Sequence, residues 1–221
     1  MKSIAVRALS LVAVGIATLS LNAPAQAEVL FQDDFEGDLS LWTGKNDGLH
    51  HGEIVADPLD SGRGGVLTFS ALNMAGDIYS RDEIAFAGPI QLSFDYLGLA
   101  SCGSVQGDLG GFLGVAYGVG PVQDGVDIFW QAGTRDGYAN LALALVDDGA
   151  WHSYSMTLDG NAFLPFHLTL EDWVESKGQA GDAFFDNVRV EVASVPEPAV
   201  GSLALLGRFS LRLLARSRRQ A

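Results

Sequence analysis

The chain has 221 residues, of which 48% are hydrophobic and 18% charged, and its formal net charge is −14. This length accommodates an ordinary domain with its own core, and the acidic balance argues against binding to nucleic acid or to anionic lipid head groups. Cys102 is the single cysteine, which excludes an intramolecular disulfide.

Residues 1–27 have the order of a secretory signal peptide. Lys2 and Arg7 precede an uncharged apolar run from Ala8 to Leu21, and the small residues of Ala25–Ala27 suit signal peptidase. The run is shorter than the roughly 20 residues of a membrane span, so an N-terminal anchor is the less favoured alternative. We predict export and cleavage after Ala27.

Residues 28–193 form the predicted domain, and most of the charge lies there. Residues 28–198 contain all 27 acidic residues and only six basic ones, a formal charge of −21. Many of these carboxylates are expected to be solvated surface groups, while the surplus favours divalent cations as partners.

Short runs with alternating apolar residues follow one another through this domain, separated by turns rich in Gly and Asp. In the clearest run, which begins at Pro89, one face carries Ile90, Leu92, Phe94 and Tyr96. Strands are expected at 28–36, 65–73, 89–96, 111–119, 126–132, 141–145, 151–158, 163–170 and 183–192. The pattern predicts an all-β sandwich or barrel.

One short helix is expected among these strands. It covers Glu171 to Lys177, is ended by Gly178 and has Thr169 as its cap. Its close carboxylates are interpreted as a solvated turn.

Aromatic residues are the candidate ligand-binding groups. The large ones are Trp42, Trp130, Trp151, Trp173, Tyr79 and Tyr138. Most are expected to lie in the core, because sandwiches usually bury their tryptophans. Trp130 and Tyr138 flank a Gly-rich turn that contains Arg135, so these three residues are the predicted site on which a sugar ring would stack.

Catalytic motifs find little support. The sequence has no G-x-S-x-G elbow, and its four histidines lack a nucleophile at a recognisable spacing: His50, His51, His152 and His167. Neighbouring strand residues point to opposite faces, which disfavours metal binding by His50 and His51 together. A non-catalytic protein is therefore predicted, with carboxylates paired only in space as the open alternative.

Asp186 is a candidate buried carboxylate. It shares the parity of the strand 183–192 with four apolar residues, Phe184, Val188, Val190 and Val192. On a core-facing strand face, such a carboxylate has to be protonated, hydrogen-bonded or bound to a cation.

Three segments resemble secreted jelly-roll domains of the galactose-binding-like and carbohydrate-binding-module type: Leu30–Gly37, Trp151–Leu158 and Ala183–Val190. The resemblance implies an antiparallel β-sandwich of jelly-roll type. It also implies one structural calcium ion, held by Glu36 and Asp186 with loop oxygens completing the shell. Concanavalin-like and laminin-G-like sandwiches remain alternatives for the fold, and a turn-capping Asp186 remains the alternative for the metal.

The last segment, residues 194–221, begins with Val195-Pro196-Glu197-Pro198. An apolar run from Ala199 to Gly207 follows. The basic tail beyond it contains Arg212, Arg216, Arg218 and Arg219. This order resembles the PEP-CTERM sorting signal of Gram-negative exosortase substrates.

That resemblance implies export across the inner membrane of a Gram-negative bacterium and transient membrane insertion of the C-terminal segment. Exosortase would then process the chain for the cell surface or extracellular matrix. Arg208 and Arg212 interrupt the apolar span, and arginine is costly within a membrane helix. The alternative is a basic C-terminal helix without a sorting role.

Taken together, these features predict a non-catalytic glycan-binding sandwich, flanked by a signal helix and a sorting helix and exported to the surface or matrix. A passive structural component of exopolysaccharide or biofilm is the first alternative. A glycoside hydrolase or lyase is the second. Polysaccharide, signal peptidase and exosortase are the expected partners.

Overall fold

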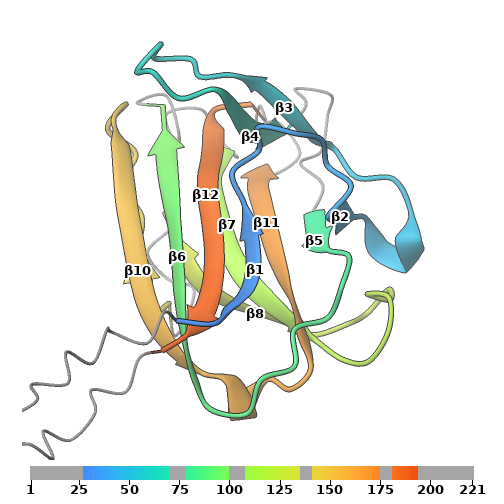
Figure 1. Ribbon diagram of the computed structural model, residues 1–221. Coiled ribbons are helices and arrows are strands. Elements are labelled where there is room, and N and C mark those ends of the chain that lie inside the picture. The colour runs from blue at the N-terminus through green and yellow to red at the C-terminus, as the bar shows by residue number, and fades with distance from the viewer. Residues whose placement is uncertain (1–26, 70–77, 100–107, 135–140, 175–180, 194–221) are drawn as a thin grey trace, which may run out of the picture.

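The computed structural model describes residues 27–69, 78–99, 108–134, 141–174 and 181–193. Within these ranges the chain forms two stacked β-sheets and two single-turn 3-10 helices, η1 (Lys45–Asp47) and η2 (Gly160–Ala162) (Figure 1). The all-β sandwich prediction is confirmed. The helices expected in the signal peptide and in residues 194–221 lie outside the described ranges.

Sheet A contains six strands: five follow the order β10, β6, β12, β4, β3, and the sixth, β1, pairs with β12. Its strands are β1 (Val29–Asp33), β3 (Gly52–Ala56), β4 (Gly65–Phe69), β6 (Pro89–Gly98), β10 (Trp151–Asp159) and β12 (Ala183–Val192). All of its pairs are antiparallel.

Sheet B has the order β2, β5, β11, β7, β8, β9. Its strands are β2 (Trp42–Thr43), β5 (Ile78–Ser80), β7 (Asp108–Tyr117), β8 (Ile128–Gly133), β9 (Leu143–Ala144) and β11 (Phe166–Val174). The short contact between β8 and β9 is parallel, and the other pairs are antiparallel.

The core lies between the two sheets and follows the alternation of the long strands. The predicted inner face of β6 is confirmed, because Ile90, Leu92, Phe94 and Tyr96 are all buried there. Met156 and Leu158 of β10 face them from the neighbouring strand. Removing such side chains from water is the main favourable contribution to the stability of the sandwich.

The helix predicted for 171–177 is wrong in its described part. Residues up to Val174 belong to β11, and Glu171 pairs with Phe112 of β7. Residues 175–180 lie outside the described ranges. Pairing with β7 outweighs local helix propensity, which a stretch this short expresses weakly in any case.

The single face predicted for β12 is also wrong, because a β-bulge divides the strand. The register with β6 shifts between Asp186 and Arg189, and Asn187 has a φ of 51°. Phe185 lies in the core before the bulge, and Val188 and Val190 lie there after it. Phe184 and Asp186 therefore lie on the outer face of sheet A.

One end of the sandwich, here called the terminal end, holds the first and last described residues. The Val192 N–H donates to the carbonyl of Glu28 (2.8 Å), and the Ala193 N–H donates to that of Pro89 (3.0 Å). This end is at the foot of Figure 1, and the β3–β4 connection is at the head. In the part of the chain that is described, no helix is long and apolar enough to cross a membrane.

Candidate functional site

Three aromatic rings lie on the outer face of sheet B, on three adjacent strands. The ring of Phe112 lies 5.5 Å from that of Trp130 and 5.6 Å from that of Trp173, measured between centroids. Phe112 is fully buried, whereas both indoles are partly exposed. We call Phe112, Trp130 and Trp173 the aromatic group.

The backbone beside the aromatic group sets the position of one indole. Gly114 of β7 pairs with Trp130 on one side and with Thr169 on the other. A Cβ at Gly114 would lie 2.7 Å from the carbonyl oxygen of Phe129 and 2.8 Å from the Trp130 ring, closer than side-chain packing allows. The absence of a side chain at Gly114 therefore lets the Trp130 ring lie against β7.

Carboxylates near the aromatic group point in two directions. Glu171 is half-buried and lies directly opposite Phe112. Asp172 is fully buried on the other side of β11, and its Oδ2 accepts the N–H of Gly181 at 2.7 Å. Among the described residues of β11, this leaves one carboxylate beside the rings, whereas glycoside hydrolysis generally needs two.

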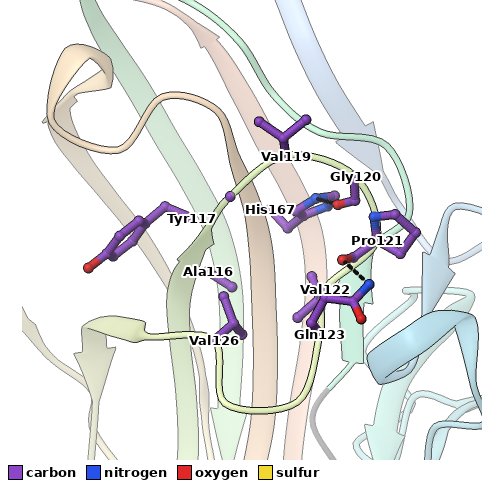
Figure 2. Close-up of a pocket in the computed structure, with 10 residues that line it drawn as sticks. Ala116, Tyr117, Val119, Gly120, Pro121, Val122, Gln123, Val126 and His167 are labelled. Atoms are coloured by element: carbon purple, nitrogen blue, oxygen red, sulfur yellow. Dashed lines mark hydrogen bonds between the residues drawn. The ribbon is translucent and has the colours of Figure 1, made fainter.

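A small pocket lies under the connection between β7 and β8 (Figure 2). His167 of β11 is buried at its base. One ring nitrogen lies 2.6 Å from the carbonyl oxygen of Ser80, and the other lies 2.9 Å from that of Gly120. The imidazole holds this connection on sheet B.

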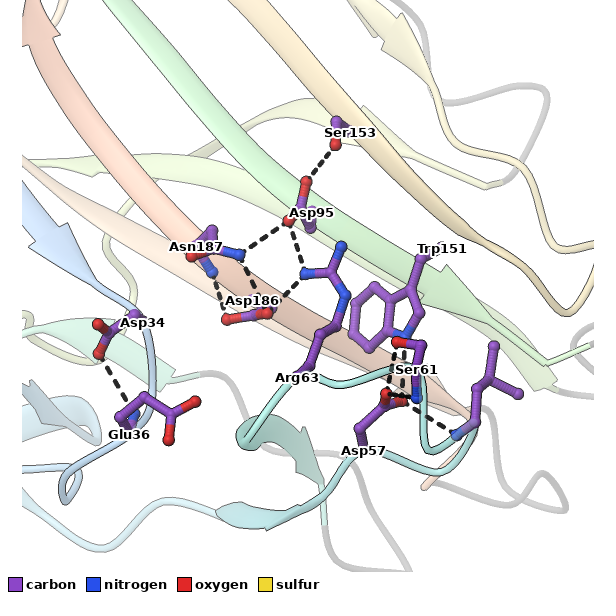
Figure 3. A network of polar contacts seen from close by, with 11 residues as sticks. Asp34, Glu36, Asp57, Ser61, Arg63, Asp95, Trp151, Ser153, Asp186 and Asn187 are labelled. Atoms are coloured by element: carbon purple, nitrogen blue, oxygen red, sulfur yellow. Dashed lines mark hydrogen bonds and ion pairs between the residues drawn. The ribbon is translucent and has the colours of Figure 1, made fainter.

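The outer face of sheet A carries a polar network (Figure 3). Arg63 reaches it from the β3–β4 connection, and its Nη1 donates to Asp95 Oδ2 (2.7 Å) and Asp186 Oδ2 (2.6 Å). The side-chain amide of Asn187 donates to the same two oxygens, at 2.9 and 3.1 Å. Ser153 donates to the other oxygen of Asp95 at 2.5 Å. We call these five residues the Arg63 network.

The two carboxylates of the network respond differently to burial. Burial by itself would raise the pKa of Asp95, but hydrogen bonds from Ser153, Arg63 and Asn187 outweigh it and hold that pKa below its ordinary value. Burial raises the pKa of Asp186 above its ordinary value, because Arg63 and the Asn187 N–H offset only part of the desolvation.

Trp151 covers the Arg63 network. The guanidinium carbon of Arg63 lies 4.4 Å from the centre of the indole, and Trp151 Nε1 donates to Asp57 Oδ1 at 3.0 Å. Burial of Asp57 alone would raise its pKa, but hydrogen bonds from Ser61, Leu59 and Trp151 bring it to about 2. Trp151 thereby fastens the β3–β4 connection onto sheet A.

The expectation that most of the six large aromatic residues lie in the core is wrong for the described ones, because Trp130, Trp151 and Trp173 are partly exposed and only two are fully buried. Trp42 is fully buried against Phe35 and Phe31, and its Nε1 donates to Asp33 at 2.6 Å. Tyr79 is fully buried as well.

Of the three residues predicted to stack on a sugar, the structure describes one. Trp130 lies in the aromatic group, while Arg135 and Tyr138 lie outside the described residues. Sequence reasoning missed Phe112 and Trp173. Phe112 has the opposite parity to the core residues Leu113 and Val115, and this alternation predicts that it lies on the outer face. Trp173 falls within the segment for which a helix is predicted, so its strand face is not apparent from the sequence.

The predicted calcium ligands lie near the Arg63 network. Asp186 Oδ1 accepts the N–H of Asn187 at 2.7 Å, which leaves this oxygen a lone pair for a cation. Glu36 is exposed, and its carboxylate lies over Gly64. No group of three or more His, Cys, Asp or Glu that could hold a metal occurs in the described ranges, so backbone oxygens or water would have to complete a shell. The calcium site stays a prediction.

No family model matches the sequence, and no curated protein matches it. Among solved structures, the N-terminal CBM22-1–CBM22-2 tandem domain of Xyn10C from Paenibacillus barcinonensis superposes with a TM-score of 0.52 and 13% identity. The match covers 80% of this chain and 52% of that one, so the chain spans about half the length of the tandem domain.

Two single modules are also similar to this chain. The CBM22-1 xylan-binding domain of the same Xyn10C has a TM-score of 0.46 and 16% identity, covering 77% of this chain and 97% of that one. A xylan-binding domain from CBM 22 has a TM-score of 0.47 and 11% identity, covering 76% and 97%. At such identities, the similarity to the tandem domain shows a shared jelly-roll sandwich fold.

Proposed function

We propose that this chain is an exported, exosortase-sorted protein of the cell surface or extracellular matrix whose sandwich binds glycan without cleaving it. The observation that carries the proposal is the state of the two indoles on sheet B. Trp130 and Trp173 are held by Phe112 and remain partly exposed.

The chemistry of that face suits a sugar. Indole rings offer flat apolar surface to the C–H groups of a pyranose, and a rigid ring loses little entropy on binding. Glu171, opposite Phe112 and half-buried, adds a carboxylate beside the rings. With a formal charge of −21 over residues 28–198, uncharged polysaccharides are favoured over polyanionic ones.

A glycan array probed with residues 28–193, which contain every described strand, tests the proposal. We expect binding to neutral polysaccharides, reduced about tenfold or more in Trp130→Ala and Trp173→Ala. Circular dichroism spectra of both variants check that they fold. Binding to no glycan by the folded wild-type domain would favour the passive structural role. Release of shortened sugars would favour the hydrolase.

A further inference from the structure

The terminal end of the sandwich exposes an apolar patch, here defined as Tyr117, Val119, Phe129 and Leu164. Their side chains are 39%, 82%, 47% and 38% exposed. The ring centroids of Tyr117 and Phe129 lie 6.5 Å apart, and those of Phe129 and Phe163 lie 5.7 Å apart. Clustered apolar groups of this kind generally mark an interaction surface rather than ordinary surface composition.

Hydrogen bonds connect the patch to the point where the domain ends. The Ala193 N–H donates to Pro89, and the neighbouring carbonyl of Gly88 accepts the N–H of Gly160 at 2.8 Å. The segment from Gly160 leads to Phe163 and Leu164, and the Gly118 N–H donates to the carbonyl of Pro165 at 2.9 Å. The patch and Ala193 therefore lie at the same end of the molecule (Figure 1).

The length of the linker limits how far this end can lie from a membrane. Only residues 194–198 separate Ala193 from the apolar run that begins at Ala199. Even fully extended, this linker reaches about 20 Å. With the apolar run in a bilayer, the terminal end lies beside the bilayer surface and the β3–β4 connection lies on the far side of the domain.

We propose that the apolar patch rests on the lipid surface while the C-terminal segment is inserted. This inference depends on the sorting role within the proposed function. Three exposed carboxylates flank the patch, at Asp124, Asp127 and Asp159. Since they repel anionic head groups, the lipid that fits is zwitterionic.

A pair of fluorescent labels tests the orientation. The chain from Glu28 to Ala221 is reconstituted in phosphatidylcholine vesicles with Cys102→Ala and one reporter, Val119→Cys or Leu59→Cys, carrying an environment-sensitive dye. Leu59 lies in the β3–β4 connection. The dye at 119 should be blue-shifted and several-fold less accessible to an aqueous quencher than the dye at 59, because only the first contacts lipid.

A matched pair of charge substitutions tests the patch itself. Leu164→Asp should expose the dye at 119, whereas Leu59→Asp, which alters a leucine of similar exposure (42% against 38%), should not. Added phosphatidylglycerol should weaken the protection of the dye, and salt should restore it. Circular dichroism checks that each variant folds.

Three results would overturn the inference. Equal quenching at 119 and 59 in inserted chains would remove the orientation. Extraction of the whole chain by carbonate would show that the segment does not insert. Protection of position 119 by soluble glycan rather than by vesicles would assign the patch to sugar. Glycan binding by Trp130→Ala, measured in parallel, tests the proposed function separately.

Discussion

On the outer face of sheet A, charged and polar side chains bond to one another, whereas on the outer face of sheet B, two indoles stand beside a buried phenyl ring. Asp95, Asp186 and Arg63 are mostly buried and are hydrogen-bonded within the protein. Trp130 and Trp173 keep part of their rings in water. The comparison separates side chains that are buried in a hydrogen-bonded network from aromatic side chains that are partly exposed.

Replacing Arg63 should cause the largest loss of stability. Arg63→Met leaves Asp95 and Asp186 buried without their cation, and we expect the free energy of unfolding to fall by about 3–5 kcal/mol. Urea denaturation measures the change. Arg189→Met is the matched control, because its partner Glu191 is partly exposed, and it should cost at most about 1 kcal/mol. Equal losses in the two variants would contradict a structural role specific to Arg63.

Replacing the tryptophan on sheet A should mainly lower stability, whereas replacing one on sheet B should mainly lower glycan affinity. Trp151→Ala removes the cover of Arg63 and should lower stability by about 2–4 kcal/mol while glycan affinity is kept. Trp130→Ala should lower affinity about tenfold or more with a smaller stability loss. Thermal melts and binding isotherms of both variants measure the contrast. Loss of binding in Trp151→Ala at a temperature where it is folded would break the comparison.

Glu36 and Asp186 are the predicted calcium ligands at the Arg63 network. Saturating calcium should stabilise the domain by about 2–3 kcal/mol at a hundredfold excess over its dissociation constant, and Glu36→Gln should abolish that gain. Melting curves with calcium and with chelator measure it. An unchanged melting temperature would leave Arg63 as the cation that neutralises Asp186.

The stability of the fold should depend on pH through the carboxylate of Asp57. Since the pKa of Asp57 is lowered to about 2, this group stabilises the fold above its ordinary pKa near 4. That contribution, about 1–2 kcal/mol, is lost as pH falls from 4 towards 2. Asp57→Asn should flatten the acid limb of the stability curve. An identical acid limb in the variant and the wild type would contradict this assignment.

The long strands were predictable because each buries one face. β6 alternates apolar and polar residues from Ile90 to Tyr96, and β10 does so from Tyr154 to Leu158, so the period of two indicates the core face in these stretches. β2, β3 and β5 were not predicted. β5 is only three residues long, and all three are buried, so it has no alternation to detect.

The candidate site was predictable only in part, because the fold brings together residues that are far apart in the sequence. Trp130 was identified from its position beside a turn. The bonds from Arg63 to Asp95 and Asp186 join residues 32 and 123 positions apart, and no local pattern indicates them. The bulge at Asn187 also reverses the parity of β12, so counting in twos assigns Asp186 and Val188 to the same face when they lie on opposite faces.

Gly114 gives the aromatic group a way to change without altering any of its rings. A methyl group there would meet both the Phe129 carbonyl and the Trp130 indole, so a change of one small residue on β7 would tilt an aromatic plane contributed by β8. A substitution on the strand beneath the indole therefore redirects the ring while every aromatic position stays the same.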